Sequence, residues 1–270
     1  MNGLKDTENG KMKNHIEKKY LAKLKNQGNI ASFFDGFLTT EYRYPLKAGY
    51  VFLNFLNSKK NRFTDFESRL HEKCLISNQK RTSEMSITLS QGTHSVFRWK
   101  NYIAFKSVFD LALYSMLITE LKPNIIIEIG SGGGGSAIWL ADMMKILGLK
   151  PKVYSYDITK PDINYPGINF IQFDLNTLNN KGEFPKSKDW KGVKLVIEDA
   201  HANVPTVLDT IDGKLNKGDY FVIEDNDAAK QKEVHSFILR AKHKYLLDQY
   251  YLDFFGRNGT SAIDSILKRG

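Results

Sequence analysis

Residues 124–141 read NIIIEIGSGGGGSAIWLA, an apolar run that passes through a glycine-rich turn into an amphipathic segment. The apolar residues at 124–130 predict a buried strand, and the segment after the turn predicts a helix. Gly130, Gly132 and Gly134 permit a tight turn and let the backbone approach a ligand that a Cβ atom would block. The N-terminus of the helix presents free N–H groups and a partial positive charge. This stretch predicts an α/β sheet with a ligand-binding loop.

Further apolar runs alternate with amphipathic segments along the rest of the chain. The expected strands lie at 152–158, 168–175, 194–200 and 219–225. A helix over 106–121 precedes the first strand and stops at Lys122-Pro123, because proline disfavours a helical conformation in the residue before it. Two β-rich stretches around the turn at 256–259 predict a final antiparallel hairpin. The fold class is therefore α/β, with a seven-stranded, mostly parallel sheet covered on both faces.

Residues 1–95 differ from the remainder in pattern and in charge. They carry 16 Lys and Arg against nine Asp and Glu, in a chain whose net charge is +9. We expect a basic, mainly helical N-terminal cap region at 1–95, with a lysine-rich helix near 12–27, and an α/β domain at 96–270. The basic region suits an anionic partner, such as nucleic acid, a phosphorylated or nucleotide-linked substrate, or a membrane surface. Basic residues do not alternate with stacking aromatic residues there, so nucleic acid is not the expected partner.

The composition indicates the cellular compartment and excludes sites that are built from cysteines. Cys74 is the single cysteine, which excludes an internal disulfide and a cysteine-built zinc site. No run reaches the roughly 18 apolar residues that cross a bilayer. We therefore expect a cytoplasmic protein without a membrane span, which assembles as a homo-oligomer. Frequent Lys and Asn are typical of a bacterium with an AT-rich genome, which weakly favours capsule or lipopolysaccharide decoration.

The glycine-rich turn fits two kinds of cofactor by its spacing. Residues 130–135 satisfy the G-x-G-x-x-G pattern of dinucleotide-binding folds, a weak signal by itself. Glu128 lies just before the turn, where it would repel a pyrophosphate but attract the cationic amino-acid end of S-adenosylmethionine. Asp157 ends the second strand and is placed to accept both hydroxyls of a ribose. Asp174 ends the third strand, where it would face an adenine amino group.

The string VIED occurs twice, at 196–199 and 222–225, and each copy ends an expected strand. Consecutive strands joined by one right-handed crossover lie side by side, about 4.8 Å apart, so the two acid pairs meet at one edge of the sheet. Clustered carboxylates repel each other unless they are protonated, paired or bound to a cation. All-oxygen ligation favours a hard ion, Mg²⁺ first, with Ca²⁺ or Mn²⁺ as alternatives. His201, beside the first copy, is suited to act as general base, with a capping or packing role as the alternative.

Several stretches from Trp99 to Gly270 together resemble the cephalosporin hydroxylase/rhamnosyl O-methyltransferase family, which is related to the macrocin-type sugar O-methyltransferases. The matching pieces are Trp99, Lys106, Asp110, Tyr114, IIIEIGSGGGGSAIWLA, SYD, VIEDAH, GDYFVIED and the terminal ILKRG. The resemblance implies a Rossmann-like class I methyltransferase fold for 96–270, with S-adenosylmethionine as its cofactor.

The resemblance also implies a set of site residues. The expected cofactor-binding residues are Glu128, Gly130, Ser131, Gly132, Gly134, Ser136, Asp157 and Asp174. Family members carry a divalent metal on an acid after the fourth strand and on two adjacent residues after the fifth, and a basic residue three positions beyond the first acid is the base in several. With His201 as the base, Glu198 is the first metal ligand and Glu224 and Asp225 are the other two. Relatives usually have Asp at the first position, so Asp199 stays an alternative.

The sequence therefore predicts an O-methyltransferase that depends on S-adenosylmethionine and a divalent metal. Its expected acceptor is a hydroxyl of a sugar on a surface-glycan or natural-product precursor, or a phosphate-type group on such a glycan. The hydroxyl attacks the sulfonium methyl in line while His201 removes its proton. Three alternatives stay open: a NAD-binding oxidoreductase or hydroxylase, an RNA-modifying or nucleic-acid-binding protein of the same fold, and an inactive cofactor-binding subunit.

Overall fold

The computed structural model describes residues 62–71, 88–179, 182–226 and 228–270. The chain divides into two compact units, Met1–Asn61 and Arg62–Gly270, and the described residues all belong to the second. The lysine-rich helix expected near 12–27 and the single cysteine, Cys74, lie outside the described residues. Within the described part of the chain, no helix combines the length and the apolar character needed to cross a bilayer.

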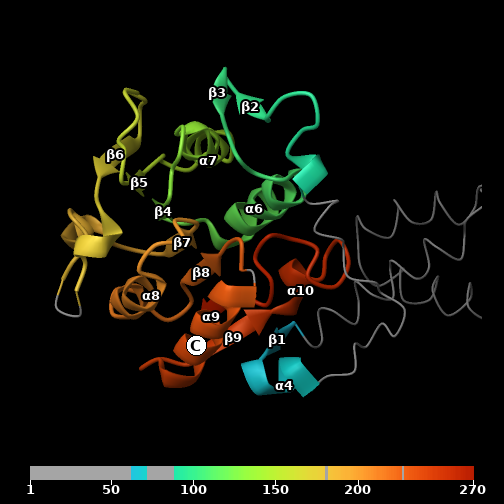
Figure 1. Cartoon of the computed structure of the whole chain (residues 1–270). Helices are drawn as coiled ribbons and strands as arrows, with labels where there is room; N and C mark the ends of the chain where they lie inside the picture. The colour runs from blue at the N-terminus through green and yellow to red at the C-terminus, as the bar shows by residue number, and fades with distance from the viewer. Residues whose placement is uncertain (1–61, 72–87, 180–181, 227) are drawn as a thin grey trace, which may run out of the picture. The chain divides into compact units, whose positions relative to one another are not determined.

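An eight-stranded mixed sheet forms the centre of the second unit (Figure 1). Its strands follow the order β1-β9-β10-β8-β7-β4-β5-β6. Their bounds are β1 Phe63–Thr64, β4 Ile125–Ile129, β5 Val153–Asp157, β6 Ile168–Gln172, β7 Lys194–Glu198, β8 Tyr220–Ile223, β9 Tyr245–Asp248 and β10 Ile266–Arg269. Strands β4 to β8 are parallel, whereas β10 is antiparallel to both β8 and β9. The expected mostly parallel α/β sheet with an antiparallel C-terminal hairpin is confirmed.

Residues 96–270 supply the seven expected strands, β4 to β10, and an eighth strand, β1, comes from before residue 96 and pairs antiparallel with β9 at the edge of the sheet. A two-residue strand has no alternating pattern that a sequence can reveal. Ion pairs fix this segment and the following helix α4 (Phe66–His71), with Arg62 2.7 Å from Asp248 and Arg69 2.6 Å from Asp253. Residues 62–71 thus fold with the sheet, and the domain boundary expected near residue 95 stays a prediction.

Helices cover both faces of the sheet (Figure 1). Helices α6 (Val108–Leu121) and α7 (Gly135–Ile146) lie on one face, and α8 (Val204–Asp212) and α9 (Ala228–Arg240) lie on the other. The crossover after β4 leads to β5 on one side, whereas the crossover after β7 leads to β8 on the opposite side. Because β4 and β7 are neighbours, the strand order reverses between them. In such a sheet, ligands bind in the crevice beyond the carboxyl ends of the strands at this point.

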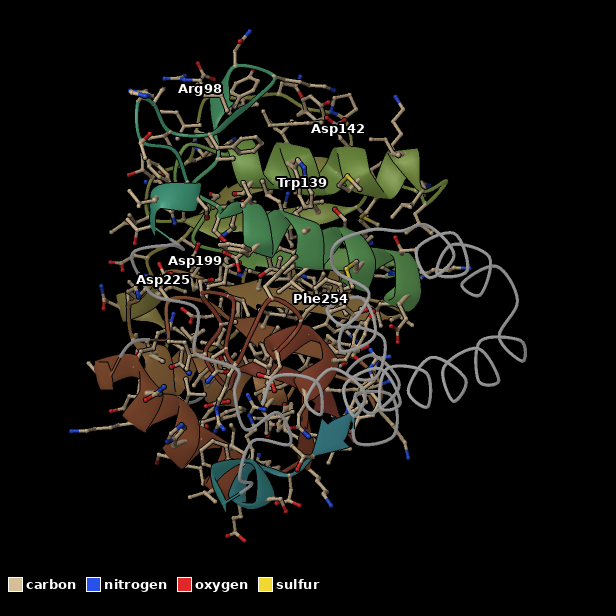
Figure 2. The ribbon with its side chains drawn as sticks, turned by 90° about the vertical axis from the view of Figure 1, so that its right-hand side faces the viewer. Arg98, Trp139, Asp142, Asp199, Asp225 and Phe254 are labelled. Carbon is tan, nitrogen blue, oxygen red and sulfur yellow. The ribbon has the colours of Figure 1, made fainter. Side chains whose placement is uncertain are left out.

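A short hairpin lies against α7. It consists of β2 (Arg98–Trp99) and β3 (Tyr102–Ile103). Asp142 of α7 accepts hydrogen bonds from Trp99 Nε1 and from the Tyr165 hydroxyl, both at 2.7 Å. Figure 2 shows Arg98 of the hairpin on the same side of the molecule as Asp142. The buried carboxylate therefore joins the hairpin to the helix that follows the glycine loop.

Two glycines of the loop are required by close backbone approaches. Gly130 has φ +98°, and a Cβ atom there would lie 2.7 Å from the carbonyl oxygen of Asp199. At Gly135 a Cβ atom would lie 2.2 Å from the carbonyl oxygen of Ile103 in the hairpin. The glycines thus let the turn fit between β7 and the β2–β3 hairpin.

We predict that Gly135→Ala destabilises the fold by about 1–3 kcal/mol, because the hairpin or α7 must shift to admit the methyl group. Gly133→Ala is the matched control in the same loop, since a Cβ atom there would meet the Ile103 oxygen at an ordinary 3.5 Å. Urea unfolding followed by circular dichroism measures both free energies of unfolding. Equal losses in the two variants would contradict the packing assigned to Gly135.

Candidate active site

A cavity of about 450 Å³ lies at the carboxyl ends of the parallel strands. Eight of the expected site residues line it, namely Gly130, Ser131, Gly132, Ser136, Asp157, Asp174, Asp199 and Asp225. The remaining five, Glu128, Gly134, Glu198, His201 and Glu224, do not line the cavity. The structure therefore brings the glycine loop and one acid from each VIED string to a single pocket.

Glu128 lies within the protein instead of at the pocket surface. Its side chain is fully buried at the end of β4, and one carboxylate oxygen accepts a 2.7 Å hydrogen bond from the Ser155 hydroxyl. Burial raises the pKa of the Glu128 carboxyl, while the Lys106 charge and the Ser136 and Ser155 hydroxyls oppose the shift. Glu128 therefore lies behind the glycine loop and does not itself line the cavity.

Asp157 and Asp174 hold the loops that border the pocket. Asp157 accepts hydrogen bonds from the backbone N–H of Gly132 at 2.9 Å and of Thr159 at 3.0 Å. Asp174 caps a short 3₁₀ helix by accepting the backbone N–H of Asn176 at 2.9 Å. Both carboxylates therefore position the backbone, and both still face the cavity.

The two VIED strings divide their acids in the same way. Glu198 is fully buried and lies 2.7 Å from the Lys230 ammonium, whereas Asp199 faces the cavity. Glu224 is likewise buried, and Asp225 is exposed beside the pocket. Successive residues along a strand point to opposite sides, so each glutamate points inward and each aspartate outward.

Lys106 links the two strings, and the sequence assigned it no role. Its Nζ atom lies 2.6 Å from Asp199 Oδ2 and 2.7 Å from Glu224 Oε2. The Tyr114 hydroxyl donates a hydrogen bond to the other oxygen of Glu224. The spacing Lys106-Asp110-Tyr114, four positions at each step, was the available signal, because it places Asp110 and Tyr114 on one face of α6 and Lys106 directly before the helix.

These contacts shift the pKa values of the inner group, Lys106, Tyr114 and Glu224. Burial raises the pKa of the Glu224 carboxyl to about 8, with Lys106 opposing the shift and Asp199 adding to it. Burial and the Glu224 charge raise the pKa of the Tyr114 hydroxyl well above its ordinary value. Burial alone would lower the pKa of Lys106, but Asp199 and Glu224 raise it well above its ordinary value. Lys106 therefore stays charged, and Tyr114 stays a hydrogen-bond donor.

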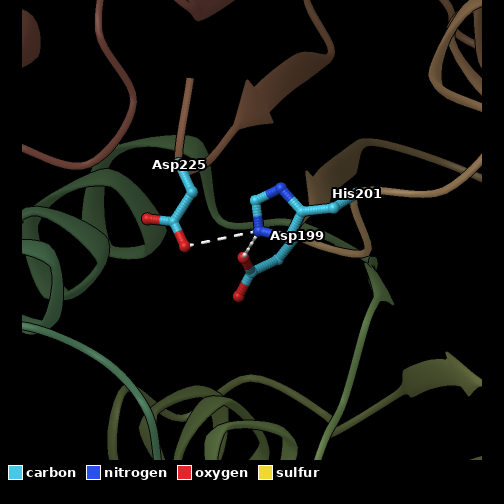
Figure 3. A group of neighbouring side chains, drawn as sticks. All are labelled: Asp199, His201 and Asp225. Atoms are coloured by element: carbon cyan, nitrogen blue, oxygen red, sulfur yellow. Dashed lines mark ion pairs between the residues drawn. The ribbon is translucent and has the colours of Figure 1, made fainter. Parts of the chain in front are cut away.

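Asp199, His201 and Asp225 form an outer group of neighbouring side chains (Figure 3), of which the two aspartates line the pocket. His201 Nε2 lies 3.4 Å from Asp225 Oδ2 and 3.8 Å from Asp199 Oδ1. One ligand atom from each residue lies within 4.8 Å of the other two. His201 and Asp225 both have positive φ, 51° and 44°, a strained conformation that is common at functional sites.

The outer group has the donor set of a site for a divalent cation. Two carboxylates and one imidazole converge, and burial together with the Asp199 charge raises the pKa of the Asp225 carboxyl, with His201 opposing. A cation placed among them would relieve the repulsion between Asp199 and Asp225. The residues present therefore fit a divalent metal. Figure 2 shows that Asp199 and Asp225 lie close together at one edge of the molecule.

Comparison with known proteins identifies a family. Residues 91–237 match the family model described as rhamnosyl O-methyltransferase/CmcI. The rhamnosyl O-methyltransferase of Mycobacterium leprae is 31% identical over 137 residues, which cover 48% of this chain and 60% of that protein. The Mycobacterium tuberculosis protein of the same name is 27% identical over 132 residues, covering 46% of this chain and 54% of that protein. The matches thus span little more than half the length of these curated relatives.

Two solved CmcI structures share the fold. The structure with SAH is 25% identical, with a TM-score of 0.52, and the alignment covers 66% of this chain and 84% of that chain. The structure with Mg and SAM is 22% identical, with a TM-score of 0.51, and the alignment covers 79% of this chain and 99% of that chain. The Rossmann-like methyltransferase fold expected from the sequence is confirmed. Since the matched residues make up more than half of its length, the chain belongs to the rhamnosyl O-methyltransferase/CmcI family.

Proposed function

We propose that the chain is an S-adenosylmethionine-dependent O-methyltransferase that uses a divalent cation, Mg²⁺ first, and acts on a sugar hydroxyl. The observation that carries this proposal is the cavity itself, which has the glycine loop on one side and Asp199 and Asp225 on the other. Such a pocket places a methyl donor beside a site that holds an acceptor. Family membership supports the same reading, since the solved CmcI structures contain SAH or Mg and SAM.

The charge of the pocket supports a cationic cofactor. Its charged lining residues are Lys106, Asp157, Asp174, Asp199 and Asp225. The excess of carboxylates attracts a sulfonium ion and repels the pyrophosphate of NAD. The same charges disfavour a phosphorylated acceptor, so we propose a neutral sugar hydroxyl instead. The cytoplasmic location, the homo-oligomer and the link to capsule or lipopolysaccharide stay predictions.

Asp199 and Asp225 are the metal ligands that we propose, with Glu224 as the third candidate. The spacing to His201 favours Glu198 as the first ligand, but its side chain is fully buried and paired with Lys230, so we propose Asp199 instead. When bound, the metal would supply a positive charge that orients an acceptor hydroxyl and lowers its pKa.

His201 is the general base that we propose. Its ring is half-exposed beside the pocket, and Nε2 faces the carboxylates of Asp199 and Asp225. His201 would take the proton as the acceptor oxygen attacks the methyl group.

Calorimetric titration with S-adenosylmethionine and with NAD⁺, each with and without Mg²⁺, tests the cofactor assignment. We expect S-adenosylmethionine to bind and NAD⁺ not to bind, because of the acidic lining. Gly130→Ala should abolish binding, since the added Cβ atom forces the loop away from Asp199. Tight binding of NAD⁺ without binding of S-adenosylmethionine would overturn the proposed function.

Asp199→Asn and Glu198→Gln distinguish the two acids of the first VIED string. We expect Asp199→Asn to weaken Mn²⁺ binding by more than about 100-fold. Substituting a residue that only supports a metal ligand usually weakens binding by about 10- to 100-fold, so a larger loss indicates a direct ligand. Glu198→Gln should leave Mn²⁺ affinity nearly unchanged, because the Glu198 side chain is buried and does not line the cavity. Asp209→Asn serves as a control, since Asp209 is exposed and pairs with Arg240. A large loss of Mn²⁺ affinity in Glu198→Gln and little loss in Asp199→Asn would instead identify Glu198 as the ligand.

Methyl transfer from radiolabelled S-adenosylmethionine to p-nitrophenyl α-L-rhamnoside tests the acceptor class. We expect transfer that depends on Mg²⁺ and is lost on addition of EDTA. His201→Ala should reduce the rate by about 10²–10⁴-fold at neutral pH, the usual contribution of a positioned base. A rate of methyl transfer to a sugar phosphate as high as that to the rhamnoside would contradict the proposed neutral acceptor. Full activity of the His201→Ala variant would show that His201 is not the base.

A further inference from the structure

Lys106 occupies the centre of the acid cluster. Its ammonium group lies within hydrogen-bonding distance of Asp199 and Glu224, which come from the ends of two different strands. The side chains of Lys106 and Glu224 are each only 4% exposed. A cation that belongs to the chain thus already pairs with one acid from each VIED string.

Asp199 is shared between this lysine and the outer group. Its Oδ2 atom pairs with Lys106 at 2.6 Å, while its Oδ1 atom faces His201 Nε2 at 3.8 Å. A divalent cation that took both Asp199 and Glu224 as ligands would need the place that the ammonium group holds. A divalent cation and the Lys106 ammonium group, both in contact with the same buried carboxylates, would repel each other strongly. Lysine and metal therefore compete for the same carboxylates.

Lys106 has a fixed backbone but a side chain that borders the cavity, and this combination permits the ammonium group to compete with a metal. The next residue, Ser107, caps α6 and pairs through its hydroxyl with Asp110, which also accepts the backbone N–H of Ser261 at 3.2 Å. The backbone at Lys106 is thus held in place. Its side chain, however, lines the cavity, so the ammonium group has space to leave the carboxylates without disturbing α6.

Lys230 shows the contrasting case. It pairs with Glu198 at 2.7 Å and donates a hydrogen bond to the backbone oxygen of Glu224 at 2.7 Å. Neither Lys230 nor Glu198 lines the cavity. Lys230 therefore joins the ends of β7 and β8 away from the cavity, whereas Lys106 lines the cavity.

We propose that Lys106 is an internal counter-cation that competes with the divalent metal for Asp199 and Glu224 and so keeps metal binding weak and exchangeable. This inference rests on the proposed metal site. In the metal-free protein Lys106 prevents repulsion between the acids. In the metal-bound protein it withdraws into the cavity, and Glu224 becomes available as a ligand.

Mn²⁺ titration followed by electron paramagnetic resonance of the free ion tests this proposal. Lys106→Met removes the charge at similar volume, and we expect it to bind Mn²⁺ at least about tenfold more tightly, because a competing charge at contact distance is gone. Lys106→Arg keeps the charge and should retain the wild-type affinity. Lys100→Met removes an exposed lysine that pairs with Asp142, and it should also retain that affinity.

Thermal unfolding of the same proteins gives a second readout. Lys106→Met should be less stable than wild type in EDTA, because Glu224 loses its counter-charge. Mn²⁺ should raise its melting temperature by more than it raises that of the wild type. Lys106→Gln, which keeps a hydrogen-bond donor, provides the same comparison if the methionine variant does not fold.

The outcomes separate this inference from the proposed function. If wild type binds Mn²⁺ and Asp199→Asn does not, the metal site stands. Unchanged or weaker affinity in both Lys106→Met and Lys106→Gln then overturns the competition alone, and would make Lys106 a residue that positions the ligands. Failure of every protein to bind Mn²⁺ overturns the metal site and the competition together.

Discussion

Two pairs of carboxylates end neighbouring parallel strands, and this constraint shapes the rest of the site. The register aligns Glu198 with Ile223, so the acids of β7 and β8 leave the sheet within one residue of each other. Their charges cannot remain close together in a buried place without cations. The protein divides each pair, burying the glutamate against a lysine and turning the aspartate toward the pocket. Lys230 and Lys106 are the two lysines that make this division stable.

The glycine loop depends on the same strand ends. Gly130 passes so close to the carbonyl oxygen of Asp199 that a side chain would not fit between them. The backbone N–H of Asp199 also donates a 2.8 Å hydrogen bond to Ile129 at the end of β4. The proposed cofactor side and the proposed metal side of the pocket are therefore joined through backbone atoms at the strand switch point. A change in the position of Asp199 would be transmitted directly to the loop.

The sequence predicted the parts of this arrangement that local patterns encode. Apolar runs gave the parallel strands, the glycines gave the turn, and the repeated VIED string gave an acid cluster at one sheet edge. It did not give the inward direction of Glu198 or Glu224, because adjacent residues at a strand end differ in direction but not in chemical type. Lys106 was missed because its partners lie about a hundred residues away, beyond any local period. Strand β1 was missed because it exists only through pairing with β9.

We propose that the aspartate of each VIED string, and not the glutamate of the first, faces the metal in the pocket. Anomalous diffraction from crystals of the protein grown with Mn²⁺ and S-adenosylhomocysteine tests it most directly. We predict a manganese peak between the carboxylates of Asp199 and Asp225, beside the cofactor in the glycine loop. A peak on Glu198, or a cofactor-loaded pocket without manganese near either aspartate, would contradict the account.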